Sequence, residues 1–285
     1  MAPPPVIVHE FDHPYLRVHQ FPSPAEGGGE GGGGGEAVNS YLLEFETGLL
    51  ILDLPLLDSV AISIRDYADQ LNKPILKVLI SHAHPDHWFG LYRFQDFPSL
   101  ATTKTIDEIR EQGANYLAFK QAQTTAPYDL PQGAIVPATS YEGGEETIDG
   151  VTLIWRKASN VEYLDGLYLE IPIHQILISG DLVYNHVHHY VGQKDEQGKL
   201  CISHWIDMLN TLRVGPFNSI FPGHGAKGGM ELIEDSITYL GALIPVVTEP
   251  GANEPQYRQF IKDNFADFDV IEMVDISAYF LLHQP

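Results

Sequence analysis

The sequence has a single cysteine and few basic residues, and each shortage excludes a class of protein. With Cys201 alone among 285 residues, disulfide scaffolds, iron–sulfur clusters and cysteine-based zinc sites are excluded. The chain has 16 Lys and Arg residues but 38 Asp and Glu residues, which gives a formal net charge of −22. A chain this acidic is not expected to bind a nucleic-acid backbone or an anionic membrane surface.

Long apolar runs are also missing. No stretch approaches the roughly 20 apolar residues that a membrane-spanning helix needs. The opening residues MAPPP show no basic segment followed by an apolar one, so we expect no secretory signal and a cytoplasmic location. Apolar residues still make up 44% of the chain, enough for a sizeable core. We expect a single domain over residues 1–285.

Glycine is concentrated in residues 26–36, EGGGEGGGGGE. We interpret this segment as a flexible surface loop, because it buries no side chain and loses much backbone entropy when ordered. After it, strand and helix patterns alternate, as in an α/β protein, and the region 230–285 is predicted to be mostly helical. The expected strands are 41–46, 48–52, 75–80, 146–148, 151–155, 167–171, 175–179 and 219–221, and the expected helices are 56–71, 104–119 and 200–212.

The strongest chemical signal is the hexapeptide HAHPDH, which directly follows an apolar strand pattern. Residues i and i+2 of an extended segment point the same way, so His82 and His84 can bind one ion together. The proline after them forces a turn, which lets Asp86 and His87 reach a neighbouring position. Imidazole and carboxylate form a ligand set for zinc, iron or manganese. The sequence therefore predicts a metal site here.

This pattern, His-x-His-x-Asp-His, resembles the hallmark of the metallo-β-lactamase superfamily. Further segments resemble that family in the same order and span about residues 38 to 230. They are Asn39-Ser40-Tyr41, Leu50-Ile51-Leu52-Asp53, Ser179-Gly180-Asp181 and Pro222-Gly223-His224-Gly225. The resemblance implies an α/β fold, a four-layer αββα sandwich of two mixed β-sheets flanked by helices.

The resemblance also implies a binuclear metal site, with two zinc ions expected and iron or manganese as other possibilities. The implied ligands are His82 and His84 for the first ion, Asp86, His87 and His224 for the second, and Asp181 for both. A water between the ions would be deprotonated near neutral pH and attack the substrate. Asp86 is also expected to act in catalysis, by orienting that hydroxide or protonating the leaving group.

Two residues outside the ligand set are candidates for supporting roles. Asp53 ends an apolar strand pattern and either hydrogen-bonds a ligand histidine or caps a turn. The segment 184–190, YNHVHHY, either lines a substrate pocket with donors for an oxyanion or forms a polar surface loop. Within it, His188 resembles a histidine that follows the bridging aspartate in related sequences, and we expect it to be catalytic. The roles of His186 and His189 stay open.

One position departs from the family. A third histidine for the first ion usually lies between the metal motif and the bridging aspartate, but residues 157–171 contain none. We expect Glu162 to take that place, with Asp165 as the competing ligand, because a carboxylate can replace imidazole on zinc. Glutamate serves as a ligand in this region of the alkylsulfatase-like branch, which this site resembles.

These features predict a metal-dependent hydrolase that acts on a small-molecule ester, lactone, thioester or sulfate ester. Two other functions remain open. One is a mononuclear iron oxygenase of the persulfide dioxygenase type, against which the complete second ligand set argues. The other is a non-catalytic relative that acts as a binding module.

Overall fold

The computed structural model describes residues 7–23, 37–123, 129–248 and 251–282. The glycine-rich segment 26–36 lies outside the described residues, so its interpretation as a flexible loop stays a prediction. The chain divides into two compact units. The first unit is Met1–Lys157 with Asp165–His174, and the second unit is Ala158–Leu164 with Gln175–Pro285. The single domain expected over residues 1–285 stays a prediction as well.

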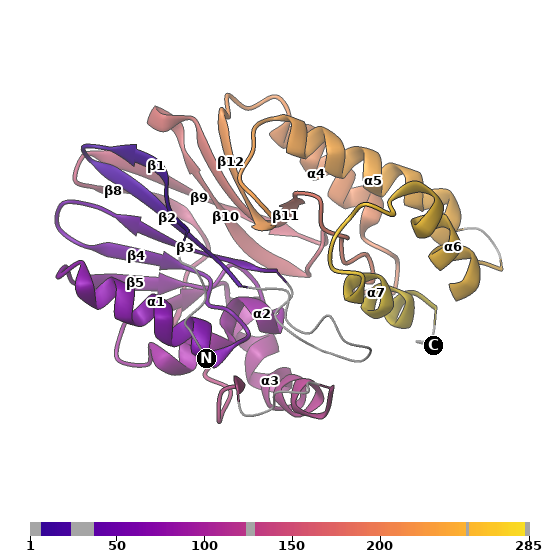
Figure 1. Ribbon diagram of the computed structural model, residues 1–285, viewed down its shortest axis with the longest axis horizontal. Helices are drawn as coiled ribbons and strands as arrows, with labels where there is room; N and C mark the ends of the chain where they lie inside the picture. The colour runs from indigo at the N-terminus through magenta and orange to yellow at the C-terminus, as the bar shows by residue number, and fades with distance from the viewer. Residues whose placement is uncertain (1–6, 24–36, 124–128, 249–250, 283–285) are drawn as a thin grey trace. The chain divides into compact units, whose positions relative to one another are not determined.

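The strands form two mixed sheets (Figure 1), one of seven strands in the order β1-β2-β3-β4-β5-β6-β7 and one of five in the order β12-β11-β10-β9-β8. The first sheet contains β1 (Ile7–His13), β2 (Leu16–Pro22), β3 (Asn39–Glu44), β4 (Leu49–Leu52), β5 (Ile75–Leu79), β6 (Ser99–Ala101) and β7 (Thr139–Ser140). The second contains β8 (Gly144–Ile148), β9 (Val151–Ser159), β10 (Asp165–Ile171), β11 (Ile176–Tyr184) and β12 (Ser219–His224).

Helices alternate with these strands and dominate the end of the chain. They are α1 (Asp58–Gln70), α2 (Pro85–Trp88), α3 (Thr103–Gln123), α4 (Ile202–Leu212), α5 (Glu231–Thr248), α6 (Glu254–Asn264) and α7 (Glu272–Leu282), with short 3-10 helices η1 (Phe89–Arg93) and η3 (Pro172–His174). No helix among the described residues combines the length and the apolar character that crossing a membrane would require.

In the first unit, β4, α1 and β5 form a parallel strand–helix–strand unit. The apolar residues Val60, Ile64 and Ala68 recur every four positions of α1, so they share one helix face. All three are buried in a core cluster with Ile51 of β4 and Val78 of β5. Burying each Val or Ile side chain contributes about 1.5–3 kcal/mol, which fixes α1 against the sheet. The carboxyl ends of β4 and β5 thereby come to lie side by side.

The hairpin between β8 and β9 forms where the sequence predicts it. Its two turn residues, Asp149 and Gly150, have φ values of 48° and 82°. Two successive positive φ angles match the twist of a two-residue hairpin, and Asp-Gly adopts them readily.

The sequence predicts that this strand ends at residue 179, but β11 continues to Tyr184. All nine residues are buried, and parallel pairing with β12 extends to the pair of Tyr184 and His224. Local sequence signals at Gly180 and Asp181 favour a strand end, but the neighbouring strand supplies hydrogen bonds beyond it. Asp181 therefore lies within a strand. The ladder is irregular between Gly180 and Tyr184, as at a β-bulge.

In the second unit, α4 and α5 run side by side (Figure 1). The buried residues of α4 are Ile202, Trp205, Leu209 and Leu212, spaced three and four apart on one face. The Trp205 indole donates to the carbonyl oxygen of Leu182 in β11 at 3.0 Å. This hydrogen bond fixes α4 close to the strand that carries Asp181.

Candidate metal centre

The first unit presents the histidine motif on the loop that follows β5 and on α2, which together form the histidine loop. Pro85 occupies the first turn of α2, where its missing N–H costs nothing, so the loop turns directly after His84. The loop is tied to its surroundings by backbone bonds, from Leu54 N to the His87 oxygen at 2.7 Å and from Leu167 N to the Ser81 oxygen at 2.9 Å. These bonds fix both ends of the motif.

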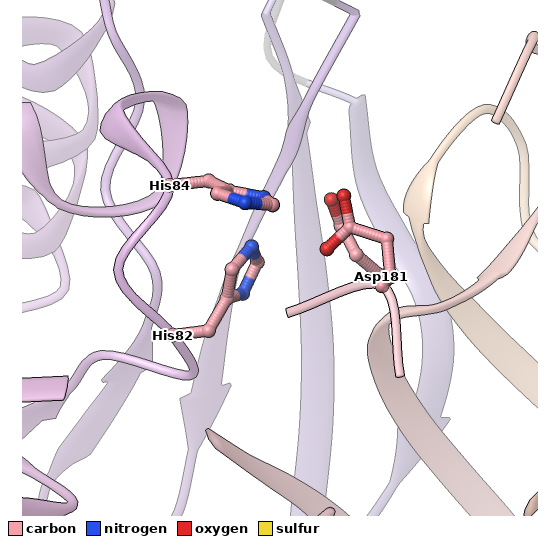
Figure 2. Close-up of side chains that lie close together, drawn as sticks. His82, His84 and Asp181 are labelled. Atoms are coloured by element: carbon pink, nitrogen blue, oxygen red, sulfur yellow. The ribbon is translucent and has the colours of Figure 1, made fainter. Parts of the chain in front are cut away.

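The histidine side chains of this loop gather on one side. The ring centroids of His82 and His84 are 4.7 Å apart, and those of His82 and His87 are 4.2 Å apart. Figure 2 shows His82 and His84 projecting from the same side of the loop, one above the other. His82, Asp86 and His87 are buried and His84 is half-buried. Imidazoles this close can offer nitrogen atoms to the same cation.

Asp53, which follows β4, accepts three hydrogen bonds from this loop. Its carboxylate receives Ser81 N–H at 2.7 Å, the Ser81 hydroxyl at 2.7 Å and His87 Nδ1 at 2.9 Å. The Ser81 oxygen lies 2.9 Å from His82 Nδ1. Because the single Ser81 proton goes to Asp53, His82 must donate from Nδ1. Asp53 thus sets the tautomers of both histidines, so Nε2 is the unprotonated nitrogen of each ring.

The second unit supplies Asp181 from β11 and His224 from the end of β12 (Asp181 is labelled in Figure 2). Their side chains meet, with His224 Nε2 at 3.2 Å from Asp181 Oδ2. Gly223 makes this approach possible, because a Cβ at that position would lie 1.8 Å from Asp181 Oδ1. Both candidate ligands are buried.

Glu162 lies in the short segment of the second unit, Ala158–Leu164. A tight turn, with Asn160 N donating to Leu164 O at 3.0 Å and Val161 N to Tyr163 O at 3.0 Å, presents its side chain. Glu162 is only 1% exposed. Its carboxylate is therefore held away from solvent, so hydrogen bonds or an opposite charge must offset the cost of burying its charged form.

The competing carboxylate, Asp165, has a different partner. It lies 3.2 Å from the ammonium nitrogen of Lys157, within the first unit. The same ammonium group lies 2.6 Å from Glu142. This ion pair gives the buried Asp165 carboxylate a compensating charge from the protein itself, with no need of a metal ion.

Tyr184 is a residue whose role sequence reasoning missed. Its hydroxyl reaches Asp181 Oδ2 at 2.9 Å and Glu162 Oε1 at 3.3 Å. Residues three apart on a regular strand point to opposite faces, so the spacing of Asp181 and Tyr184 gives no signal of contact. The irregular ladder between Gly180 and Tyr184 alters this alternation, and no pattern in the sequence predicts the irregularity.

The histidines after β11 contact the C-terminal elements. His188 is buried, with Nδ1 at 3.1 Å from the Tyr239 hydroxyl and its ring against Phe268. Burial lowers the pKa of His188 to about 4, so the ring is neutral at pH 7. These contacts give His188 a packing role, and its catalytic role stays a prediction. His186 is exposed, whereas His189 is buried against Tyr184.

Seven side chains could hold metal ions. The first unit supplies His82, His84, Asp86 and His87, and the second unit supplies Glu162, Asp181 and His224. Imidazoles, two of them with fixed tautomers, and buried carboxylates are the donors that zinc, iron and manganese take. The donor chemistry therefore fits a divalent metal.

The fold is similar to that of solved metallo-beta-lactamases. The IND-7 enzyme gives a TM-score of 0.62 at 18% identity, over 84% of this chain and 99% of that one. The enzyme from Pontibacter korlensis gives 0.61 at 15% identity, over 83% and 99%. The DIM-1 enzyme exposed to ceftazidime gives 0.60 at 17% identity, over 85% and 99%. At these identities the likeness concerns the fold alone.

In sequence, no curated protein matches the chain. The family model described as the metallo-beta-lactamase superfamily matches residues 33–224, more than half of the chain. The predicted fold class, α/β with two mixed β-sheets flanked by helices, is confirmed. The chain belongs to the metallo-beta-lactamase superfamily.

Proposed function

We propose that the protein is a metal-dependent hydrolase that uses two zinc ions to cleave a small-molecule ester, lactone, thioester or sulfate ester. The observation that carries the proposal is the chemistry of the seven candidate ligands, four histidines and three carboxylates. Glu162 occupies the place of the third first-site histidine, supported by its burial beside Asp181 and by the engagement of Asp165 with Lys157. Zinc ions, when bound, lower the pKa of a bound water to near neutral and so supply the attacking hydroxide.

The chain's own residues would prepare and support this attack. Asp53 keeps Nδ1 of His87 protonated, and through Ser81 that of His82, so both rings offer a lone pair at Nε2. Asp86, buried beside His87, would hold the proton that is passed to the leaving group. His188, neutral at pH 7, is the further candidate for a donor to the developing negative charge.

The proposed surroundings of the enzyme follow from its composition. A net charge of −22 favours an uncharged or metal-coordinated small substrate over a polyanion. One buried cysteine and no pairing partner suit a reducing compartment, and we propose a cytoplasmic location.

The decisive experiment compares His84→Ala with His204→Ala, a change of the same type on the exposed face of α4. Metal content is measured by elemental analysis, and hydrolysis is measured on a panel of p-nitrophenyl esters, lactones, thioesters and sulfate esters. We expect two zinc ions per parent chain and turnover of at least one class. His84→Ala should lower zinc content and reduce the rate by roughly 100-fold or more, while His204→Ala matches the parent.

Other results would support one of the alternative functions or refute the proposal. One iron per chain with oxygen uptake would identify a mononuclear oxygenase. Metal binding without turnover across the panel would identify a binding module. A parent protein that binds no divalent metal, or a His84→Ala variant with full metal content and rate, would refute the proposal.

A further inference from the structure

We propose that Tyr184 is a positioning residue that holds the Glu162 and Asp181 carboxylates together, and that the chain needs it because Glu162 replaces a histidine. The inference rests on the proposed function, since it treats both carboxylates as metal ligands. It assigns to Tyr184 a role towards ligand side chains, where the sequence indicates only a donor in a substrate pocket or a residue of a polar surface loop.

The hydroxyl group carries the first part of the argument. It lies 2.9 Å from Asp181 Oδ2 and 3.3 Å from Glu162 Oε1, and all three side chains are buried. A phenol has one proton, so two carboxylates share it, with Asp181 the closer acceptor. Two buried carboxylates repel each other, and a shared donor stabilises their charged forms and limits their rotation.

The ring of Tyr184 has little freedom to move. It stacks on His224 with centroids 4.8 Å apart and an interplanar angle of 5°, and on His189 at 4.5 Å and 21°. His189 in turn stacks on Tyr239 at 4.3 Å and is anchored by Nδ1 to the Val187 oxygen at 3.2 Å. This column of rings fixes the place of the hydroxyl.

His189 suits this column because it stays uncharged. Burial lowers its pKa to about 3, so the ring remains neutral over the pH range of most enzymes. A neutral ring can stack between two tyrosines without the cost of burying a charge. The support for Tyr184 therefore does not change with pH near neutrality.

The glutamate explains why such a hydroxyl is needed. A carboxylate ligand can bind a metal through either oxygen and in several orientations, whereas an imidazole offers one lone pair in its ring plane. A metal-bound histidine at position 162 would also present no acceptor to the phenol, because its second nitrogen carries a proton. The Tyr184 hydroxyl should therefore matter more when residue 162 is glutamate than when it is histidine.

A double-mutant cycle tests this dependence. Zinc affinity and stoichiometry are measured by competition with a chromogenic chelator in the parent, Tyr184→Phe, Glu162→His and the double variant. Tyr184→Phe should weaken one zinc site roughly 10- to 100-fold in the parent, and clearly less in the Glu162→His background, where only the hydrogen bond to Asp181 is lost. The visible absorption of the Co²⁺-substituted protein should shift more with Tyr184→Phe when Glu162 is present than when it is replaced.

Tyr257→Phe is the matched control, because it removes the same atom from a fully buried tyrosine, on α6. It should leave zinc affinity and the Co²⁺ spectrum unchanged. Should Glu162→His fail to fold, Glu162→Ala replaces it, since it also removes the acceptor.

Equal losses in both backgrounds would overturn the proposal, as would unchanged zinc affinity in Tyr184→Phe. A parent protein with two zinc ions and turnover would then leave the proposed function intact. A parent protein that binds no zinc would refute both.

Discussion

Asp53 has a positive φ of 60°, a conformation that most residues avoid and that Asp and Asn tolerate. That conformation brings its carboxylate under Ser81 and His87, where it receives three hydrogen bonds. A residue that touches no metal in the proposed site therefore determines how two candidate ligands present their nitrogen atoms. Such partners typically contribute 10- to 100-fold to metal affinity.

Replacing Asp53 by Asn tests this contribution while keeping the backbone conformation accessible. An amide accepts through one oxygen only, so we expect zinc affinity to fall roughly 10- to 100-fold. The free energy of unfolding should fall by about 1–3 kcal/mol, because a buried donor loses its acceptor. Chelator competition and urea denaturation measure the two effects.

Asp149→Asn provides the matched control for this substitution. Asp149 also has a positive φ, and its carboxylate also accepts from a backbone N–H and a hydroxyl, both of Thr47. It is half-buried, in the hairpin turn. Zinc affinity should be unchanged in this variant; a loss equal to that of Asp53→Asn would show that the effect is not specific to the histidine loop.

Gly223→Ala tests the close approach of β12 to Asp181. The added Cβ would stand 1.8 Å from Asp181 Oδ1, so the carboxylate must move. We expect loss of zinc binding and a lower melting temperature. Gly241→Ala in α5 adds the same methyl group where nothing lies within 4 Å, and should be neutral or stabilising by up to about 1 kcal/mol. Normal zinc binding by Gly223→Ala would mean that Asp181 does not need its present position.

Among the secondary-structure elements, α3, β9 and β10 are joined by one charged cluster in the first unit. Glu142 accepts from the Thr103 amide at 2.8 Å, at the beginning of α3, and from Lys157 of β9 at 2.6 Å. Lys157 also pairs with Asp165 of β10 at 3.2 Å. A carboxylate at a helix N-terminus meets amide protons that lack helical acceptors. The cluster thus links the helix to β9 and β10.

The pH dependence of stability should report on this cluster. The hydrogen bond from Lys157, followed by that from the Thr103 amide, lowers the pKa of Glu142 to about 2 from the usual 4.5. Its contribution is therefore present above pH 4.5 and is lost as the pH falls towards 2. Between pH 6 and 3, metal-free parent protein should lose more urea stability than Glu142→Gln. The exposed Glu145→Gln should follow the parent; identical curves for the parent and Glu142→Gln would contradict this assignment.

At the scale of the whole molecule, an acidic chain with 22 excess negative charges buries the carboxylates of its candidate metal ligands. Burying a carboxylate is costly, and divalent cations would offset that cost in the folded protein only. Zinc should therefore stabilise the fold by about 4 kcal/mol at a free concentration 1,000 times its dissociation constant. Calorimetry with zinc and after chelation measures the shift of the melting temperature.

The same comparison in two variants locates the effect. His84→Ala should show a smaller zinc-dependent shift than the parent, and His204→Ala should show the full shift. An equal shift in all three proteins would place the stabilising zinc elsewhere on the acidic surface.

Local patterns in the sequence were sufficient to predict the family and most of the secondary structure. Apolar residues at every fourth position predict α1. Asp149-Gly150 predicts the hairpin, and the HAHPDH motif predicts a metal site. These predictions depend on residues within a few positions of one another, where periodicity and turn chemistry act directly.

The tertiary structure alone decided contacts between residues far apart in the chain. Asp165 forms an ion pair with Lys157, the Tyr184 hydroxyl donates to Glu162, and Asp53 accepts a hydrogen bond from His87. The tertiary structure also extends β11 past Asp181, because pairing with β12 continues there. Strand register and a β-bulge determine which carboxylate pairs with a lysine and which accepts a hydrogen bond from a hydroxyl. Both are set by packing against other elements, and a one-residue change in either would alter every contact.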